Sequence, residues 1–332
     1  MNVPGKPFLG PTHSVDVDGR DLVELDASTR GALGPQIGFH ERYEVLGTIG
    51  SGGMGEVKLC RDRTVGREVA MKIIRQSDTG SPRRWRFVRE ARIQGQLEHP
   101  AVVPVYDFGV DPEGNLYFTM KRVRGVSLAE VIEALAAGDP TAERRWGRRR
   151  LLTAFSQVCL AVGFIHSRGV VHRDLKPSNV MLGDFGEIYV LDWGLVKLIG
   201  RLGAADRGLV DASNAATTGQ GSVLGTPGYM SPEQLRGEVD RVDQRADVYS
   251  LGSILFELLV REPLHPRGAT KEKLISVLTT DGARTRSRPR GLSVPDALDD
   301  LVARATRLHP EDRLETASAM SEAIEAYLDA PG

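Results

Sequence analysis

One short segment and one later residue bring together polar side chains that could perform phosphoryl chemistry. The segment His172–Asn179 reads HRDLKPSN and contains a carboxylate, an ammonium group and an amide at Asp174, Lys176 and Asn179. Asp192 follows an apolar, strand-like stretch. Asp174 could accept or orient a hydroxyl proton, and Lys176 could neutralise a transferring phosphoryl group. Asn179 and Asp192 offer the hard oxygen ligands that suit Mg²⁺.

A glycine-rich loop precedes these residues in the sequence. Gly50, Gly52 and Gly55 have the G-x-G-x-x-G spacing, which lets backbone N–H groups approach a phosphate without obstruction by a Cβ atom. The loop lies between two predicted strands, and this placement argues against the dinucleotide-binding form of the motif. Lys72 ends the apolar run Val69–Lys72. A lysine in such a strand needs an anion, and a phosphate over the glycine loop would supply one.

Glu90 is the acid that could hold Lys72 in place. It lies in a predicted helix over 85–97, one turn before an apolar residue. The alternative is that Glu90 is a solvated acid among the arginines of this helix. That alternative would be preferred without the polar segment at 172–179.

The elements that must position these residues fall into an α+β, two-lobed arrangement. Residues 1–41 are rich in Gly, Pro and Asp, which predicts a loose extension. We expect a small antiparallel β lobe over 42–123, with strands at 43–49, 57–61, 68–74, 102–108 and 116–123 and one helix at 85–97. A larger, mostly helical lobe is expected over 124–330, with helices at 128–137, 151–167, 246–260, 271–278, 297–308 and 317–328.

Composition limits the class of protein. The 332 residues carry a net charge of −1, with 41% hydrophobic and 26% charged residues. These values exclude gross disorder, collagen and coiled coil, and they predict no nucleic-acid partner. Cys60 and Cys159 lie far apart in the sequence, so we expect no disulfide framework, a reducing compartment and two buried, small apolar side chains.

The sequence predicts no membrane segment in this chain. No run of 18 predominantly apolar residues occurs, and 151–166 has the polar interruptions of a core helix. The N-terminal residues lack the apolar centre of a signal peptide. We therefore expect a cytoplasmic location, with the alternative that the chain is a fragment of a longer membrane-anchored protein.

Two arginine clusters could recruit acidic substrates, membrane lipid or nucleic acid. At a net charge of −1 we interpret both as solvated faces. The clusters are Arg144, Arg145, Arg148, Arg149 and Arg150, and Arg284, Arg286, Arg288 and Arg290.

From about Tyr43 to Leu328 these motifs resemble the eukaryotic-like serine/threonine protein kinases, in the bacterial, Hanks-type branch. The resemblance implies a two-lobed protein-kinase fold, ATP as phosphoryl donor, and Mg²⁺, with Mn²⁺ as an alternative. It implies that Lys72, paired with Glu90, binds the α- and β-phosphates, that Asp174 is the catalytic aspartate with Lys176 beside it, and that Asn179 and Asp192 hold the metal. The implied ATP-binding residues are Gly50, Gly52, Gly55, Val57, Ala70, Lys72, Met120, Lys121, Val123 and Met181.

The resemblance extends into the segment that closes the activation loop. GTPGYMSPE at 225–233 is similar to the segment that docks the substrate, with Ser231 where alanine is usual. Lys176 together with Thr226 is the family's serine/threonine pattern, so proteins with Ser or Thr acceptors are the implied substrates. The resemblance also implies structural roles for Asp247 and for a Glu233–Arg313 ion pair.

Regulation is also implied. In similar kinases the arginine at the position of Arg173 meets a phosphorylated residue of the activation loop. The candidate phosphosites are Thr217, Thr218 and Ser222, and we hypothesise autophosphorylation there, with self-association for transfer between two copies. The alternative, a flexible insertion, has comparable support.

Three features differ from the family pattern. Trp193 replaces the usual phenylalanine, Lys121 and Arg122 place positive charge at the hinge, and Gln94 stands where an apolar spine residue is usual. Gln94 predicts a looser helix. We therefore keep a second hypothesis, a pseudokinase or signalling scaffold that binds nucleotide or partners without turnover. A small-molecule phosphotransferase is a third, which the intact 225–233 segment argues against.

Overall fold

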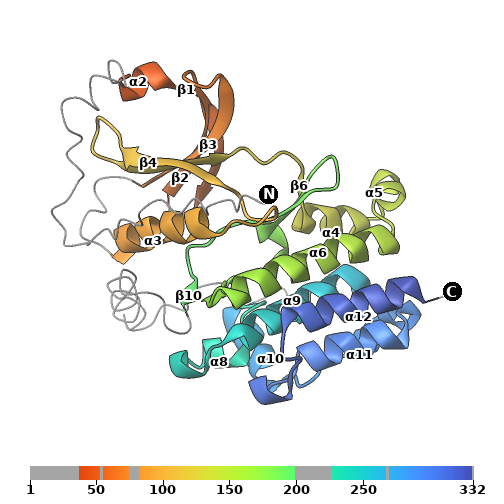
Figure 1. Cartoon of the computed structure of the whole chain (residues 1–332). Coiled ribbons are helices and arrows are strands. Elements are labelled where there is room, and N and C mark those ends of the chain that lie inside the picture. The colour runs from red at the N-terminus through yellow and green to blue at the C-terminus, as the bar shows by residue number, and fades with distance from the viewer. Residues whose placement is uncertain (1–36, 53–54, 75–81, 199–225, 267–268, 331–332) are drawn as a thin grey trace, which may run out of the picture.

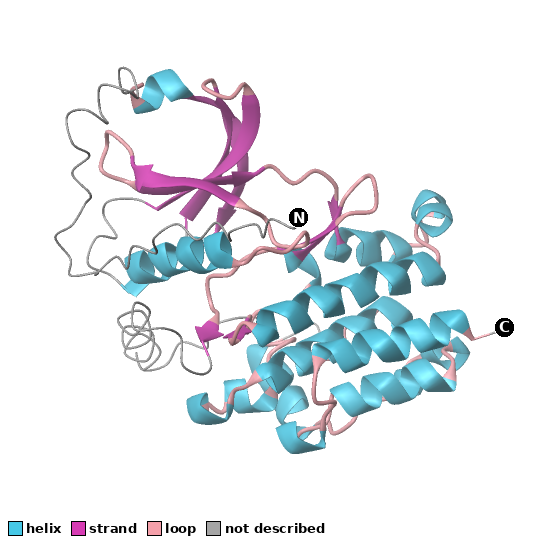
Figure 2. Cartoon of the chain, in the orientation of Figure 1, coloured by secondary structure: helices cyan, strands magenta, loops and turns pink. Residues whose placement is uncertain are grey.

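The computed structural model describes residues 37–52, 55–74, 82–198, 226–266 and 269–330. Within these ranges the chain has a small part dominated by strands and a larger part dominated by helices, joined by an extended connection (Figure 1; Figure 2). The predicted α+β fold class, with a small antiparallel sheet and a larger helical part, is confirmed.

The small part is a five-stranded antiparallel sheet in the order β1-β2-β3-β5-β4. A short helix, α2 (Phe39–Arg42), precedes the sheet, and helix α3 (Pro82–Gln96) lies against it (Figure 1). The strands are β1 (Tyr43–Gly52), β2 (Gly55–Asp62), β3 (Arg67–Ile74), β4 (Val105–Val110) and β5 (Leu116–Lys121).

The two-residue period of β3 decides which side chains face α3. Val69 and Met71 are fully buried in a cluster on the opposite face. Ile74 packs with Phe87 of α3. Because alternate residues of a strand share a face, Lys72 is directed to the same side as Ile74, towards the helix that carries Glu90.

The larger part is built around α9 (Gln244–Val260), whose residues from Ala246 to Val260 are all buried. Helices α6 (Arg148–Ser167), α11 (Asp296–Ala305) and α12 (Ala317–Asp329) belong to the same hydrophobic core. The remaining helices are α4 (Leu128–Ala136), α5 (Pro140–Arg145), α8 (Pro232–Leu235) and α10 (Thr270–Thr279).

Two small sheets lie where the two parts meet, and they carry the polar segment. Strands β6 (Val126–Ser127), β8 (Val180–Leu182) and β9 (Ile188–Val190) form one sheet. Strands β7 (Val170–Val171) and β10 (Lys197–Leu198) form the other. His172–Asn179 connects β7 to β8, and Asp192 follows β9, so both polar segments leave short paired strands.

The predicted elements agree with the structure apart from boundaries and short elements. Helix α6 begins at Arg148, before the predicted start, and α5 was not predicted although Asp139 caps it and Pro140 opens it. The predicted limit of the extension at residue 41 falls inside α2. The limit at 123/124 falls between β5 and β6, and the division into domains at these positions remains our proposal.

Helix α6 is, among the described residues, the one helix whose length and apolar composition would allow it to cross a membrane. Leu152, Val158 and Val162 of this helix are fully buried among the other helices. A core helix passes the same compositional test, and the burial of these side chains agrees with the core helix predicted over 151–166. Cys60 and Cys159 are also fully buried, as predicted, and burial raises the pKa of Cys60 to about 11.

Candidate active site

The ammonium group of Lys72 is held by a buried carboxylate. Lys72 Nζ lies 2.6 Å from Glu90 Oε1, and Glu90 is only 3% exposed. Burial raises the pKa of Glu90 although Lys72 attracts its ionised form. Lys72 Nζ also lies 4.0 Å from Asp192 Oδ1. The geometry places one cation between two acids at the face of the small sheet.

Asp174 is the centre of a hydrogen-bond network. Lys176 Nζ donates to Asp174 Oδ2 at 2.7 Å and to Thr226 Oγ1 at 2.9 Å. The backbone N–H of Thr226 donates to Asp174 Oδ1 at 3.1 Å. Asn179 Nδ2 donates to the Asp174 carbonyl at 2.8 Å. The aspartate therefore meets a residue far along the chain, and this contact fixes its orientation.

A buried carboxylate holds the backbone that presents Asp174. Asp247 accepts hydrogen bonds of 2.8 Å from the N–H groups of His172 and Arg173 and from His166 Nε2. Burial alone would raise the pKa of Asp247, but these hydrogen bonds hold it below its ordinary value. Arg173 has φ 71°, a left-handed conformation that costs energy, and its carbonyl accepts from Gln234 Nε2 at 2.9 Å. The strained turn at Arg173 is thus held at its N–H group by Asp247 and at its carbonyl by Gln234.

Asn179 and Asp192 have the chemistry of a magnesium site. The amide nitrogen of Asn179 donates to Asp174, so its oxygen is the atom that remains for a metal. The Leu191 N–H donates to the Asn179 carbonyl at 2.8 Å, which brings Asp192 beside Asn179. Asp192 is 42% exposed at its side chain and has φ 62°. One carboxylate and one amide fit a Mg²⁺ ion that keeps several waters and binds substrate phosphates.

No cluster of three or more His, Cys, Asp or Glu side chains suited to a metal occurs in the described part of the chain. This finding agrees with a site made from a single aspartate and an asparagine.

The glycine loop and most of the residues expected around ATP lie on the five-stranded sheet. Gly55 has φ 137°, and a Cβ there would lie 2.2 Å from the Ile73 carbonyl oxygen, so only glycine fits. Val57 pairs with Lys72 across the β2–β3 ladder, and Ala70 pairs with Met120 across β3–β5. Strands β1, β2, β3 and β5 carry Gly50, Gly52, Val57, Ala70 and Met120, and Lys121 ends β5. Val123 lies in the connection that follows β5, and Met181 lies on β8. The Lys121 N–H already donates to Pro104, so this group is not available to a nucleotide.

The positive charges expected at the hinge have partners on the protein. Lys121 Nζ donates to the Tyr189 hydroxyl at 2.5 Å and lies over its ring. Arg122 pairs with Glu68, which also accepts from Arg124 at 3.0 Å. The predicted charge at the hinge is therefore directed to neighbouring side chains.

Gln94 and Trp193 are both buried in the interior of the site. The Trp193 ring is 1% exposed and packs 4.9 Å from the His172 ring. Gln94 is 4% exposed, and its Nε2 donates to the Val103 carbonyl at 2.7 Å and approaches Met120 Sδ at 3.9 Å. The sequence predicted a looser helix at Gln94. The structure differs, because the amide ties α3 to the chain that enters β4.

We expect Gln94→Met to destabilise the protein by about 1–3 kcal/mol, because it leaves the buried Val103 carbonyl without its donor. Urea unfolding measures the change. Gln96→Met, on the same helix but exposed, is the matched control and should be close to neutral. Equal unfolding midpoints for the two variants would show that the tether adds no stability.

Three cations converge near Arg173, and the sequence indicated only one of them. Burial, with repulsion from Arg173, lowers the pKa of Arg89 to about 10. Burial and the same arginine also lower the pKa of Lys197. Arg89 lies on α3 and Lys197 on β10, so only the fold brings them together. The mutual repulsion of these half-buried cations favours an anion at this place.

The segment after the activation loop is attached to the helical core by a buried ion pair. Arg313 NH1 and NH2 each lie 2.7 Å from a carboxylate oxygen of Glu233, and the two side chains are 0% and 1% exposed. Glu233 belongs to α8, which follows Thr226 in the chain. The candidate phosphosites Thr217, Thr218 and Ser222 lie outside the described residues.

Comparisons with known proteins agree with this geometry. The model of the protein kinase domain matches residues 43–324. The chain is 34% identical over 303 residues to serine/threonine-protein kinase PknD of Chlamydia trachomatis, covering 87% of this chain and 32% of that protein. It is 36% identical over 284 residues to serine/threonine-protein kinase PknB of Mycobacterium tuberculosis, covering 84% and 42%. The chain therefore spans about a third of the length of the first of these relatives. The resemblance seen in the sequence is confirmed, and because the match extends over most of its length, the chain belongs to the protein kinase family.

Proposed function

We propose that this chain is a serine/threonine protein kinase that transfers the γ-phosphoryl group of ATP to hydroxyl groups of proteins. The observation that carries the proposal is the network at Asp174, where Lys176 and Thr226 meet the carboxylate. A hydroxyl acceptor seated beside Asp174 would give its proton to that carboxylate. Its oxygen would form a bond to the γ-phosphorus as the bond from phosphorus to the β-phosphate oxygen breaks, and ADP leaves.

The other residues stabilise charge in this proposal. Lys72, held by Glu90, binds the α- and β-phosphates, and Lys176 faces the negative charge of the transferring group. Asn179 and Asp192 would hold Mg²⁺, which neutralises charge on the phosphate oxygens when it is bound. Thr226, bonded to Lys176, shapes the position of the acceptor, and its pairing with this lysine supports Ser and Thr acceptors over Tyr.

Autophosphorylation is part of the proposal. Arg173, with Arg89 near enough to feel its charge, is the proposed partner for a phosphate group of the activation loop, in the same chain or presented after transfer between two associated copies. Lys197 adds positive charge nearby, although its ammonium group is bonded to the Val239 and Val242 carbonyls. The nucleotide-binding scaffold that the sequence left open rested on Gln94 and Trp193. Both residues are buried within the site. Gln94 ties α3 to the chain that enters β4 and Trp193 packs on His172, so neither contact supports the looser arrangement from which that alternative started.

The test is incorporation of label from γ-labelled ATP into the chain and into a generic protein acceptor, with Mg²⁺, with Mn²⁺ and with a chelator. We expect metal-dependent label on phosphoserine and phosphothreonine, and mass spectrometry of the same sample should locate phosphate among Thr217, Thr218 and Ser222. ATP binding without any transfer would support the scaffold instead. Label on sugars but not on proteins would support a small-molecule phosphotransferase.

A further inference from the structure

The first arginine cluster lines a cavity on the helical part of the chain. We call it the basic pocket. It has a volume of about 750 Å³ and lies between the start of α6 and the turn that joins β8 to β9. Its positive side chains are Arg144, Arg145, Arg148, Arg149 and Arg150. All five side chains are exposed, as the sequence interpretation expects, but they surround a hollow and do not cover a flat face.

The placement of these arginines opposes the stability of α6. Arg148, Arg149 and Arg150 occupy the first turn of a 20-residue helix, which has no acidic residue there and no side-chain cap at Gly147. The positive end of a helix dipole favours acids at these positions and disfavours bases. Three bases at an uncapped helix start therefore attract anions strongly. The stability of α6 does not explain why arginines occupy these positions.

Charge within the pocket is poorly balanced by the protein. Arg145 pairs with Asp184 at 3.3 Å. The other arginines donate to uncharged oxygens: Arg144 to Thr141 Oγ1 and Arg148, Arg149 and Arg150 to backbone carbonyls. Within the described ranges, Asp184 is thus the acid that pairs with this cluster, and Glu187 also lines the pocket, so two acids face five arginines. The pocket has room for further negative charge.

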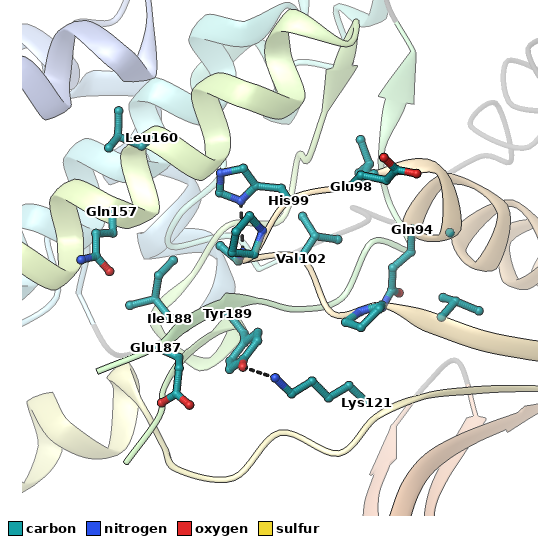
Figure 3. A pocket seen from close by; sticks show the side chains of 16 residues that line it. Gln94, Glu98, His99, Val102, Lys121, Gln157, Leu160, Glu187, Ile188 and Tyr189 are labelled. Carbon is teal, nitrogen blue, oxygen red and sulfur yellow. Dashed lines mark hydrogen bonds between the residues drawn. The ribbon is translucent and has the colours of Figure 1, made fainter. Parts of the chain in front are cut away.

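A second cavity continues the basic pocket. This apolar pocket has a volume of about 680 Å³ and shares Gln157, Glu187 and Ile188 with the first (Figure 3). Its floor includes Leu160, which is 45% exposed, and Figure 3 shows Gln157 and Leu160 on one helix facing the strand that carries Ile188 and Tyr189. Together the two pockets form one groove with a basic half and an apolar half.

The edge of the groove carries a further exposed apolar side chain. Phe185 is 94% exposed and lies between Gly183 and Gly186, which both line the basic pocket. An aromatic ring so exposed beside a hollow is a feature of protein interaction sites.

We propose that this groove binds an extended segment of a protein substrate that carries acidic side chains in the basic pocket and apolar side chains in the apolar pocket. Glu98 lines the apolar half and Glu187 lies where the two halves meet. The one lysine of the apolar half, Lys121, is bonded to Tyr189, so a uniformly anionic ligand such as nucleic acid would be repelled by the two acids. A concave groove also fits a peptide chain better than the flat surface of a membrane. That the bound segment belongs to a substrate rests on the proposed kinase function, whereas binding of such a segment does not.

The experiment measures binding without catalysis. Fluorescence anisotropy of the labelled peptide DEDEGSLVVL, and of its reversed sequence, gives a Kd for the full chain. We expect the amide version NQNQGSLVVL to bind at least about tenfold more weakly, and added salt to weaken the acidic peptide alone. The double variant Arg144→Gln/Arg148→Gln removes two exposed guanidinium groups that make only long bonds to neutral oxygens. It should raise the Kd about tenfold.

The matched control is Arg61→Gln/Arg63→Gln, which removes two exposed positive charges from the small part of the chain. This control should leave the Kd unchanged, and equal unfolding midpoints should show that both double variants are folded. Equal affinity of the acidic and amide peptides, or equal loss in both variants, would overturn the proposal. Preferential binding of phosphatidylserine vesicles or single-stranded RNA through Arg144 and Arg148 would overturn it as well.

A second measurement separates docking from catalysis. A protein acceptor is phosphorylated with and without the acidic-apolar peptide fused to it. We expect the fusion to lower KM about tenfold at unchanged kcat, and Arg144→Gln/Arg148→Gln to abolish that advantage while leaving the plain acceptor unaffected. If neither acceptor is phosphorylated, the proposed function fails and the anisotropy result still decides the binding site. If the fused and the plain acceptor have the same KM, the groove does not bind substrates during catalysis.

Discussion

Asp174→Asn should lower kcat for phosphoryl transfer by about 10²–10⁴-fold and leave the affinity for ATP close to that of the unaltered chain. Asparagine keeps the size of the side chain and an oxygen that can accept from the Thr226 N–H. It replaces the carboxylate that pairs with Lys176 and cannot take the acceptor proton. Single-turnover transfer from labelled ATP measures the rate, and a nucleotide titration measures the affinity.

The control for this variant is Asp329→Asn, which removes an exposed acid at the end of α12 and should leave kcat unchanged. A second check is the unfolding midpoint, because Asp174 belongs to a buried network. If Asp174→Asn keeps near-normal kcat in a folded protein, the carboxylate is not the proton acceptor. The proposed mechanism would then have to place the acceptor elsewhere than beside Thr226.

Local patterns in the sequence were sufficient to predict the strands and the polar groups that lie within one short segment. The apolar run Val69–Lys72 predicted a strand whose lysine needs an anion, and His172–Asn179 displayed its polar groups in order. The apolar character of α9 likewise predicted a core helix. In each case the information lies within a few neighbouring residues, where period and turn chemistry act directly.

Contacts between distant residues could not be predicted in this way. The sequence predicted a looser helix at Gln94, because the acceptor of its amide, the Val103 carbonyl, lies outside α3 in the chain that enters β4. Arg89 and Lys197 gave no signal, since only the packing of α3 and β10 brings them near Arg173. The groove beside α6 also required the fold, because a run of arginines has the same sequence whether it covers a flat face or a hollow.

Arg313→Met should destabilise the protein by about 3–5 kcal/mol, because it leaves the carboxylate of Glu233 buried without its cation. The loss also removes hydrogen bonds from Arg313 to the carbonyls of Arg245, Arg307 and Leu308. Urea unfolding with a common m-value measures the change. The matched control is Arg63→Met, whose partner Glu44 is exposed, and which should cost about 0–1 kcal/mol.

The double variant Glu233→Gln/Arg313→Met separates the free-energy cost of the buried, unpaired carboxylate from the cost of the hydrogen bonds lost with Arg313. Because it neutralises the orphaned carboxylate, it should be more stable than Arg313→Met alone. The pair also fixes α8, whose Gln234 holds the Arg173 carbonyl, so Arg313→Met should lower kcat at a temperature where the protein is still folded. If the single variant costs no more than Arg63→Met, the pair is not what attaches the segment after the activation loop to the helical core. In that case the hydrogen bond of Gln234 and the contacts of Thr226 with Asp174 and Lys176 must hold the segment on their own.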